Sequence, residues 1–443
     1  MIVSMIERGC RVGFFGLGTS STALLEFLPI EKCRVTLRSD KEINWSAIPC
    51  GAKIERIFMG PSACTDIDED VLIFSPSVRR DRPELESAKA RGVIFTSDAE
   101  LFFSRTNKPV FAVTGSDGKS TTATLISRLL TAGGTENALI GNIGQPMLPS
   151  INDTDTFVAE LSSFMLSYLK PKAIRGCITN ITPNHLNWHK SYEEYKKTKI
   201  LLTKHSNEFV ISDDLMDLSG AYGIISDEQN FYNLKKKYSA KIYITVEDGY
   251  ILRNGEKIIE TRKIKRNEKH NLKNAMMAIA MTDGYVSDRQ IACVLSDFGG
   301  LAHRCEKVLS VGGIDFFDSS IDSTPKRTAM TLESFGRRVV VILGGRSKGL
   351  DFKELLPSLK KYAEKVIVTG ENAKEIFECV GMETDAVIIP DFETAVIMGK
   401  KLAKEVGALL LSPASTSYDL FNNYAERGDR FKSILQKSSR NEN

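Results

Sequence analysis

The chain has 443 residues, 42% of them hydrophobic and 26% charged, and its 59 basic and 56 acidic residues leave a formal net charge of +3. This mix is typical of a globular protein of two to four domains, and so small a net charge excludes a surface built for nucleic acids. The longest apolar runs are strand-sized, far below the roughly 20 residues of a membrane helix. Because residues 1–8 also lack the pattern of a secretory signal, we expect a cytoplasmic protein without membrane insertion.

Eight cysteines are scattered along the chain, without a C-x-x-C pair and without histidines at zinc spacing. They are Cys10, Cys33, Cys50, Cys64, Cys177, Cys293, Cys305 and Cys379. Most have apolar neighbours, which is typical of buried free thiols. The sequence therefore predicts no structural zinc.

Residues 1–108 alternate short apolar runs with helix-like stretches. Candidate strands are Arg11–Phe15, Cys33–Leu37, Lys53–Phe58, Val71–Phe74 and Val93–Phe95. Strands that alternate with helices predict a parallel, Rossmann-like sheet in an α/β fold. The loop Gly16-Leu17-Gly18 follows the first strand, but Ser21 replaces the third glycine of the dinucleotide fingerprint. Another nucleotide at the strand ends is therefore favoured over a dehydrogenase cofactor.

Residues 109–303 begin at a proline, which marks a joint. Candidate strands are Val110–Val113, Thr156–Ala159, Gly176–Thr179 and Phe209–Ser212. The turn signals Asp248-Gly249 and Asn254-Gly255 predict a small antiparallel meander beside a mostly parallel sheet. Helices near Leu272–Asp283 and Asp288–Phe298 complete this central domain.

A phosphate-binding loop follows the first strand of that domain. It reads Thr114-Gly115-Ser116-Asp117-Gly118-Lys119-Ser120-Thr121 and leads into a helix. Gly115 and Gly118 allow unusual backbone dihedrals and leave room for phosphate oxygens, while the helix N-terminus faces the anion. Lys119 would bridge the β- and γ-phosphates, and a hydroxyl of Ser120 or Thr121 would bind Mg²⁺.

Residues 304–443 repeat strand then helix. Candidate strands are Val339–Leu343, Lys365–Thr369, Ala386–Ile389 and Leu409–Leu411, and candidate helices are Phe352–Tyr362, Ala373–Cys379 and Glu393–Val406, with another helix at the end. This alternation predicts a second Rossmann-like, doubly wound parallel sheet.

Polar residues between these elements stand where an ordinary core would avoid them. Glu160 ends an apolar strand, so its carboxylate is either exposed at the sheet end or kept for a metal. His185 taken alone is more simply a structural hydrogen-bonding group, and the charged residues from Glu193 to Lys197 are typical of a solvated helix face. Their order after a phosphate loop favours the functional interpretation.

That order resembles the Mur ligase family, which adds amino acids to the peptidoglycan precursor, and the match runs nearly from end to end. The matching motifs are the phosphate loop at 114–121, Gly-Asn-Ile-Gly at 141–144, Glu-Leu-Ser-Ser-Phe at 160–164, Asn-Ile-Thr…His-Leu at 180–186, Tyr-x-x-x-Lys at 195–199, His270-Asn271-x-x-Asn274, His303-Arg304, Leu-Gly-Gly…Lys-Gly at 343–349, and Leu-Ser-Pro-Ala at 411–414 with Asn-x-x-x-Arg-Gly at 423–428. The motifs at 160–164, 343–349 and 411–428 look like those of the D-glutamate-adding member, and the Asp-Asn-Pro-Arg signature of the diaminopimelate- or lysine-adding member is absent.

The resemblance implies a three-domain enzyme, with a UDP-substrate domain at 1–108, an ATPase domain at 109–303 and an amino-acid domain at 304–443. It implies a monomer acting on ATP, UDP-N-acetylmuramoyl-L-alanine and D-glutamate in the cytoplasmic part of peptidoglycan synthesis. The alanine carboxylate would attack the γ-phosphate of ATP, and the amine of D-glutamate would then attack the resulting acyl phosphate. The protein's part is alignment and charge neutralisation.

The resemblance also implies roles by position. The catalytic residues would be Lys119, Glu160, His185 and Lys199. ATP contacts would be Gly115, Ser116, Asp117, Gly118, Lys119, Ser120, Thr121, Asn271, Asn274, Arg304 and Asp318. Two Mg²⁺ ions would be held by Ser120, Glu160, His185 and a CO₂-derived carbamate on Lys199. Substrate contacts would be Thr19, Ser39, Ser75, Asn142, Ser162, Lys348, Ser417 and Tyr424.

The sequence departs from the family's pattern at several positions. Val113 stands where the standard phosphate loop has its first glycine. Asn184 and Asn187 flank His185 where relatives often have Asp, which lowers the negative charge beside that metal. Ser320 replaces a common lysine near the incoming amino acid, which puts the affinity for that amino acid in doubt.

Three alternatives remain at this point. Another Mur-type or folylpolyglutamate-type ligase would join a different amino acid. A non-catalytic amidotransferase subunit of this fold would carry a cysteine cluster, which is absent from the sequence. An NAD-dependent oxidoreductase would need an acidic ribose partner about 20 residues after the glycine loop at Gly16, and none is clearly placed there.

Overall fold

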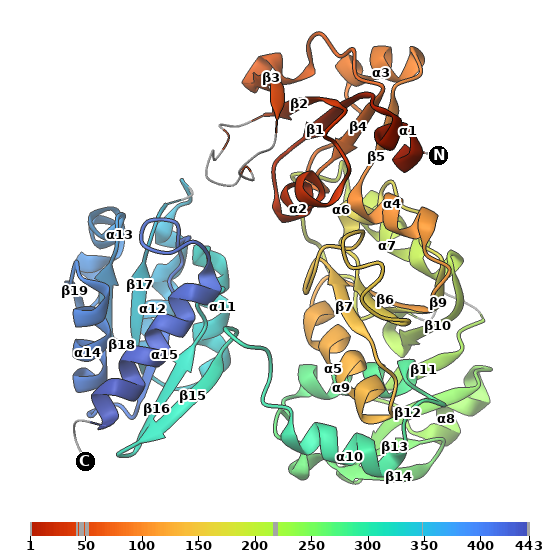
Figure 1. Cartoon of the computed structure of the whole chain (residues 1–443). Coiled ribbons are helices and arrows are strands. Elements are labelled where there is room, and N and C mark those ends of the chain that lie inside the picture. Colours follow the sequence, from red (N-terminus) through yellow and green to blue (C-terminus); the bar gives the residue numbers. More distant parts are fainter. Residues whose placement is uncertain are drawn as a thin grey trace. The chain divides into compact units, whose positions relative to one another are not determined.

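The computed structural model describes residues 2–40, 43, 48, 53–215, 220–347 and 349–440. The chain divides into two compact units, Met1–Phe298 and Gly299–Asn443, which together contain three β-sheets (Figure 1). The first unit holds the sheets of both the first and the second predicted segments, and the second unit begins a few residues before the predicted boundary after residue 303. Within the described ranges, no helix is long and apolar enough to cross a membrane.

The first sheet is parallel, with the strand order β3-β2-β1-β4-β5. Its strands are β1 Arg11–Phe15, β2 Arg34–Ser39, β3 Ile54–Met59, β4 Val71–Phe74 and β5 Ile94–Thr96. They agree with the predicted strands to within two residues at each end. Helices α1 Ile2–Arg8, α2 Thr19–Phe27, α3 Pro83–Ala90 and α4 Asp98–Arg105 accompany them. Phe14 and Phe15 pack into two different apolar clusters because neighbouring strand residues face opposite sides, so both faces of the sheet are covered.

The central sheet has nine strands in the order β14-β13-β12-β11-β10-β9-β6-β8-β7. They are β6 Val110–Thr114, β7 Ala138–Gly141, β8 Phe157–Glu160, β9 Ala173–Ile178, β10 Ser206–Ser212, β11 Gly223–Ser226, β12 Ile242–Glu247, β13 Tyr250–Arg253 and β14 Glu256–Glu260. The predicted meander is confirmed as antiparallel β12–β13–β14, and it continues the parallel part of the sheet. Strands β7 and β11 were missed because four-residue runs with glycine at one end give little periodicity.

The sheet changes its winding direction at β6, and this places the site. From β6 the chain passes through α5 Lys119–Ala132 toward β8 and β7, whereas from β9 it passes through α7 Tyr192–Lys204 toward β10 on the other side. Right-handed crossovers in opposite directions place α5 and α7 on opposite faces (Figure 1). The loops after β6 and β9 therefore lead to helices on opposite faces, and the ends of these two strands form the switch point at which such sheets bind ligands.

The third sheet has the order β15-β16-β20-β17-β18-β19. Its strands are β15 Glu306–Val311, β16 Ile314–Asp318, β17 Val339–Gly344, β18 Ala363–Thr369, β19 Ala386–Ile388 and β20 Ala408–Leu411. The prediction of a wholly parallel sheet was wrong at one edge, where β15 runs antiparallel to β16. The cause is Gly312-Gly313, whose positive φ angles of 58° and 79° suit a two-residue hairpin turn.

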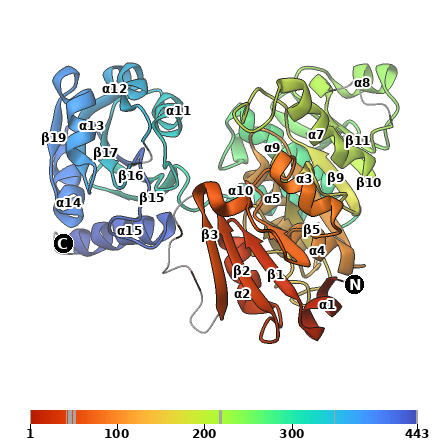
Figure 2. The ribbon, with the colours of Figure 1, turned by 90° about the horizontal axis from the view of Figure 1, so that it is seen from above.

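Helices cover both faces of the third sheet. On one face, α14 Phe392–Leu402 and α15 Tyr424–Arg440 pack together, and Figure 2 shows α15 along the sheet. On the other face lie α11 Pro325–Phe335, α12 Leu356–Tyr362 and α13 Ala373–Val380. Residues of β17 alternate between the two clusters, with Val341 in one and Val340 in the other. The predicted run of buried aliphatic residues at 339–343 is thus explained by burial on both sides.

A buried ion pair joins β2 to the loop before β4. The Arg38 guanidinium donates to both carboxylate oxygens of Glu69, at 2.8 and 3.1 Å. It also donates to the carbonyl oxygens of Ala63, Thr65 and Asp66. Both charged side chains are fully buried, so each depends on the other for compensation.

We predict that Arg38→Met lowers the free energy of unfolding by about 3–5 kcal/mol, because it leaves the Glu69 carboxylate buried without its partner. Urea unfolding followed by circular dichroism measures the change. The matched control is Arg34→Met on the same strand, whose partner Glu55 is exposed, and this loss should stay below about 1 kcal/mol. Equal losses in the two variants would contradict the prediction.

Candidate functional site

The phosphate loop runs from β6 to α5 in a conformation that requires its glycines. Gly115 has φ +145° and Gly118, the N-cap of α5, has φ +76°. A Cβ on Gly115 would lie 1.9 Å from Thr179 Oγ1, and one on Gly118 would lie 2.2 Å from Asn274 Oδ1. The loop is therefore pressed between the end of β9 and helix α9 Lys269–Met281, and no larger residue fits at either position.

Residues just after β9 hold the loop in place. Asn180 accepts from the backbone N–H of Asp117 at 2.9 Å and donates to its carbonyl at 3.0 Å. Ser116 Oγ lies 2.8 Å from the Tyr195 hydroxyl. These supports were not predicted as site residues, because the sequence alone does not show that β9 lies beside β6. Asn180 and Tyr195 do stand inside motifs that the sequence singles out.

Two lysines lie on this loop. Lys119 Nζ donates to the carbonyl of Ser116 at 2.7 Å. Lys199 is 1% exposed, and its Nζ donates to the Gly115 carbonyl at 2.6 Å. Burial, and then the nearby charge of Lys119, holds the pKa of Lys199 well below its ordinary value, against the opposite effect of Asp117 and Glu160. The lowered pKa favours the neutral, nucleophilic amine over the ammonium.

Glu160 fits a metal site. It is fully buried at the end of β8, beside Val113 in the register of β6. Its Oε1 accepts from Asn142 Nδ2 at 2.7 Å, whereas its Oε2 has no hydrogen-bond partner. A buried carboxylate oxygen without a partner is costly unless a cation compensates it. The prediction that Glu160 and Asn142 belong to one site agrees with this contact.

His185 lies on the loop after β9 with φ +53°. Its ring is 4.9 Å from the ring of Phe164, which follows Ser162 and Ser163 in the motif after β8. Ser162 caps the short helix α6 Ser163–Leu166 by accepting from Met165 N at 3.2 Å, a structural role not predicted for it. The structure therefore brings the loops of His185 and Glu160 together through Phe164.

A second histidine, His189, was missed as a functional candidate. It is buried, and its Nε2 lies 3.0 Å from Ser163 Oγ. Burial lowers the pKa of His189 below its ordinary value, although Glu194 opposes the shift. The contact with Ser163 therefore lets His189 support the Ser162-Ser163 turn. The spacing of four residues between His185 and His189 is the sequence feature that could have indicated this role.

The other predicted contacts of the first unit lie at two places. Thr19 begins α2, Ser39 ends β2 and Ser75 follows β4, so all three stand at the carboxyl edge of the first sheet. Asn274 lies against Gly118 of the phosphate loop. Asn271 is one turn earlier on α9, where its amide donates to Glu268 at 2.9 Å. Ser120 and Thr121 occupy the first turn of α5.

The remaining predicted residues belong to the second unit. Arg304 precedes β15, Asp318 ends β16, Ser417 follows β20 and is buried, and Tyr424 begins α15. Lys348 lies outside the described residues. The backbone N–H of Ser320, the residue that replaces a common lysine, donates to Asp318 Oδ1 at 2.8 Å.

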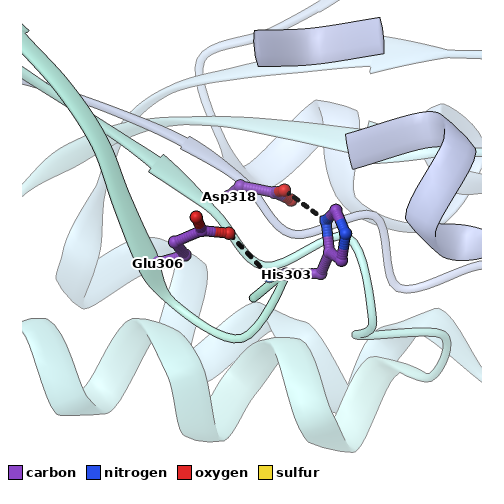
Figure 3. Close-up of side chains that lie close together, drawn as sticks. All are labelled: His303, Glu306 and Asp318. Carbon is purple, nitrogen blue, oxygen red and sulfur yellow. Dashed lines mark hydrogen bonds and ion pairs between the residues drawn. The ribbon is translucent and has the colours of Figure 1, made fainter. Parts of the chain in front are cut away.

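Asp318 belongs to a cluster with His303 and Glu306 that has the composition of a metal site (Figure 3). However, His303 Nδ1 lies 2.8 Å from Asp318 Oδ2, and the backbone N–H of His303 donates to Glu306. The ammonium of Lys432 lies 2.7 Å from Glu306 and 3.6 Å from Asp318. Because a protein cation already compensates these carboxylates, we assign no metal here.

Comparisons with known proteins identify the class. The family model of the Mur ligase middle domain matches residues 113–282, and that of the Mur ligase glutamate ligase domain matches residues 303–415. The chain is 34% identical to the UDP-N-acetylmuramoylalanine–D-glutamate ligase of Ruminiclostridium cellulolyticum, over 96% of each chain. It is 32% identical to the protein of the same name from Clostridium botulinum strain 657, again over 96% of each.

Solved structures agree on the fold. The UDP-N-acetylmuramate–alanine ligase of Thermotoga maritima superposes with a TM-score of 0.60 at 19% identity, covering 97% of this chain and 100% of the other. A type C pseudomurein peptide ligase from Methanothermus fervidus gives 0.51 at 16% identity, covering 97% and 99%. The family models and the relatives named as ligases define an ATP-dependent ligase. The chain belongs to the Mur ligase family.

We predict that Lys199→Met changes how stability depends on pH. An unfolded lysine has a pKa of about 10.4, so between the lowered pKa of folded Lys199 and that value the unfolded chain binds a proton that the folded chain lacks. The free energy of unfolding of the wild type should therefore rise with pH through this window, and the rise should be smaller in Lys199→Met. Urea midpoints between pH 7 and 10 in CO₂-depleted buffer test this. Parallel curves would contradict the lowered pKa.

Proposed function

We propose that this enzyme joins D-glutamate to UDP-N-acetylmuramoyl-L-alanine, with ATP converted to ADP and phosphate, as a cytoplasmic monomer. The observation that carries the proposal is the similarity to relatives named for this reaction, at 31–34% identity over 96% or more of the chain. The fully buried Glu160 beside the phosphate loop supports the same chemistry. We assign the first sheet to a Rossmann-like substrate domain at 1–108 and the central sheet to an ATPase domain at 109–303. The third sheet belongs to a Rossmann-like amino-acid domain at 304–443.

The loop at 115–121 would hold the phosphates of ATP. Helix α5 begins at Lys119, so its N-terminus would attract an anion, and the Lys119 ammonium can leave the Ser116 carbonyl for a phosphate oxygen. Asn271 and Asn274, together with Arg304 and Asp318, complete the proposed nucleotide contacts.

Two Mg²⁺ ions would be held by Ser120, Glu160, His185 and a carbamate on Lys199. The free Oε2 of Glu160 fits a cation, and the low pKa of Lys199 fits carbamate formation, because only a neutral amine attacks CO₂. When bound, the metal supplies charge neutralisation for phosphoryl transfer. His189 keeps the Ser162-Ser163 turn in place beside this site.

The chemistry follows from a weakness of the substrate, since a carboxylate is a poor electrophile until one oxygen becomes a leaving group. An oxygen of the alanine carboxylate attacks the γ-phosphorus of ATP, and ADP leaves. The D-glutamate amine then attacks the acyl carbon, loses a proton, and phosphate leaves with the former carboxylate oxygen. The residues of the loop align the reactants and balance negative charge during both steps.

Recognition of the two substrates would fall to separate elements. We assign the UDP moiety to Thr19, Ser39 and Ser75 at the carboxyl edge of the first sheet, with Asn142 and Ser162 facing the muramoyl-alanine end. We assign the carboxylates of D-glutamate to Lys348, Ser417 and Tyr424. The serine at 320 removes one cation from that set, so D-glutamate should bind less tightly than it does in relatives with lysine.

The acceptor can be tested by measuring phosphate release with ATP, Mg²⁺ and UDP-N-acetylmuramoyl-L-alanine. We expect D-glutamate to support turnover at least about 100-fold above L-glutamate, L-lysine or diaminopimelate. L-Lysine leaves the groups for the second carboxylate unpaired, and L-glutamate and diaminopimelate cannot place the amine and both carboxylates in the same geometry. L-Alanine serves as the control without a side-chain carboxylate. If D-glutamate releases no phosphate while another amino acid does, the proposed acceptor is wrong.

The carbamate can be tested by Lys199→Ala, which should lose at least about 100-fold in kcat because an anionic group beside the metals disappears. Short carboxylic acids added to the assay should restore part of that activity by supplying the missing anion. Lys197→Ala is the matched control, since Lys197 stands on the same helix but is exposed, and it should keep full activity. Full activity of Lys199→Ala without any acid would exclude the carbamate.

A further inference from the structure

A contact between two loops joins the first sheet to the central sheet. The loop after β4 carries Ser77 and Arg79, and the loop after β9 carries Trp188. The Trp188 indole N–H donates to the Ser77 carbonyl at 2.9 Å, and the Arg79 guanidinium lies over the indole ring, 4.9 Å from its centroid. Arg79 also donates to the Trp188 carbonyl. We call these three residues the Arg79–Trp188 clasp.

Charged groups on both loops surround the clasp and hold the arginine in position. Arg79 pairs with Asp81 at 2.6 Å and lies 3.8 Å from Glu194 of α7. Lys190 reaches back to Asp81 at 3.2 Å. Most of the Arg79 side chain is covered. A planar guanidinium can stack on the indole and donate to a carbonyl and a carboxylate at once, which a lysine cannot do.

The clasp leads directly to the turn that carries His185. The backbone N–H groups of Trp188 and His189 both donate to the His185 carbonyl at 3.0 Å. The Trp188 ring also lies 4.7 Å from the ring of Phe164, which in turn lies 4.9 Å from the His185 ring. Whatever holds Trp188 therefore holds both the backbone and the ring surroundings of His185.

The other end of the clasp leads to the first sheet. Ser77 lies two residues after Ser75, on the loop that closes over Gly16, where an added Cβ would lie 2.9 Å from the Ser75 side chain. A ligand bound at the carboxyl edge of this sheet would therefore contact the same short loop that hydrogen-bonds to Trp188. The two loops form a path from one ligand-binding edge to the other through contacts in van der Waals and hydrogen-bond range.

We propose that Arg79 is a positioning residue that fixes the His185 turn, so that the metal-binding geometry depends on the first sheet and on the nucleotide substrate held there. This inference rests on the proposed function for the identity of that substrate. Arg79 acts on His185 through Trp188, with which it makes its stacking and hydrogen-bond contacts. The clasp constrains the geometry of the His185 turn, and a displacement of about 1 Å there is large enough to affect turnover.

The test compares Arg79→Ala, Arg79→Lys and Trp188→Phe with Arg34→Ala, whose exposed ion pair with Glu55 lies on the same sheet away from the clasp. We expect Arg79→Ala to lower kcat about tenfold or more, to raise severalfold the Mg²⁺ concentration for half-maximal activity, and to leave the KM for D-glutamate within about twofold. Trp188→Phe keeps the ring contacts and should lose less. Arg79→Lys should lie between wild type and alanine.

Coupling through Trp188 gives a second criterion. The double variant Arg79→Ala/Trp188→Ala should be no worse than Trp188→Ala alone, because both changes remove one interaction. Additive losses would overturn the proposal. The proposal would also be overturned if the kcat and the Mg²⁺ dependence of Arg79→Ala stayed within twofold of wild type. An equal Mg²⁺ shift in Arg34→Ala would overturn it too, because that result would show a general loss of stability.

A third readout separates this inference from the proposed function, since it needs no turnover. The sequence has two tryptophans, so Trp45→Phe leaves Trp188 as the only one. In that background, Arg79→Ala should shift the fluorescence emission of Trp188 to longer wavelength because the indole ring becomes more exposed to water. Arg34→Ala should cause no such shift. A wild type inactive with D-glutamate would refute the proposed function alone, whereas an unchanged emission would overturn the clasp.

Discussion

Strand β6 lies between β8 and β9, and its register sets Val113 beside Glu160 on one side and beside Cys177 on the other. Every group at the site takes its position from this arrangement. The loop after β6 begins between the ends of β8 and β9. Glu160 stands at the end of β8, and Thr179 and Asn180, just after β9, hydrogen-bond to residues 114–117. Because neighbouring parallel strands are about 4.8 Å apart, residues distant in sequence are held within contact distance by the backbone ladder itself.

The same closeness creates the electrostatic character of the site. Lys199 reaches the Gly115 carbonyl from α7, on the face opposite to α5, and it is buried in the process. Lys119 donates to the Ser116 carbonyl of the same loop. Burial, and then repulsion by the charge of Lys119, lowers the pKa of Lys199. An anion at the loop would relieve this repulsion, so the charges around the loop favour phosphate.

Much of the fold could be predicted from the sequence, because long buried strands such as 71–74 and 339–343 give unbroken apolar runs and the loop at 114–121 combines glycines with a lysine. Other parts could not. The hairpin at Gly312-Gly313 joins β16 to β15, a strand without a buried residue, and the contact of Asn274 with Gly118 spans 156 residues. Sheet order decides which loops meet, and periodicity carries no information about sheet order.

The candidate site, like the fold, could be predicted only in part from the sequence. Glu160, Asn142 and Lys199 were placed by their order after the phosphate loop and by the family resemblance, and the structure brings Glu160 and Asn142 into contact. Arg79 and Trp188 carried no signal, since an arginine before a proline-containing helix start and an aromatic residue in a loop are both ordinary. Their significance comes from being 109 positions apart and in contact.

The strand order of the third sheet has a consequence for how the chain is made. Strand β20, the last strand of the sequence, lies between β16 and β17 and is hydrogen-bonded to both. During synthesis the earlier strands of this unit emerge with a gap in the middle of their sheet, and the gap can be filled only when residues 408–411 arrive. Domains generally complete their folding in order from the N-terminus. The first unit can therefore be finished on the ribosome while the second still exposes two unpaired strand edges, and a ribosome stalled before β20 would release an aggregation-prone half-sheet.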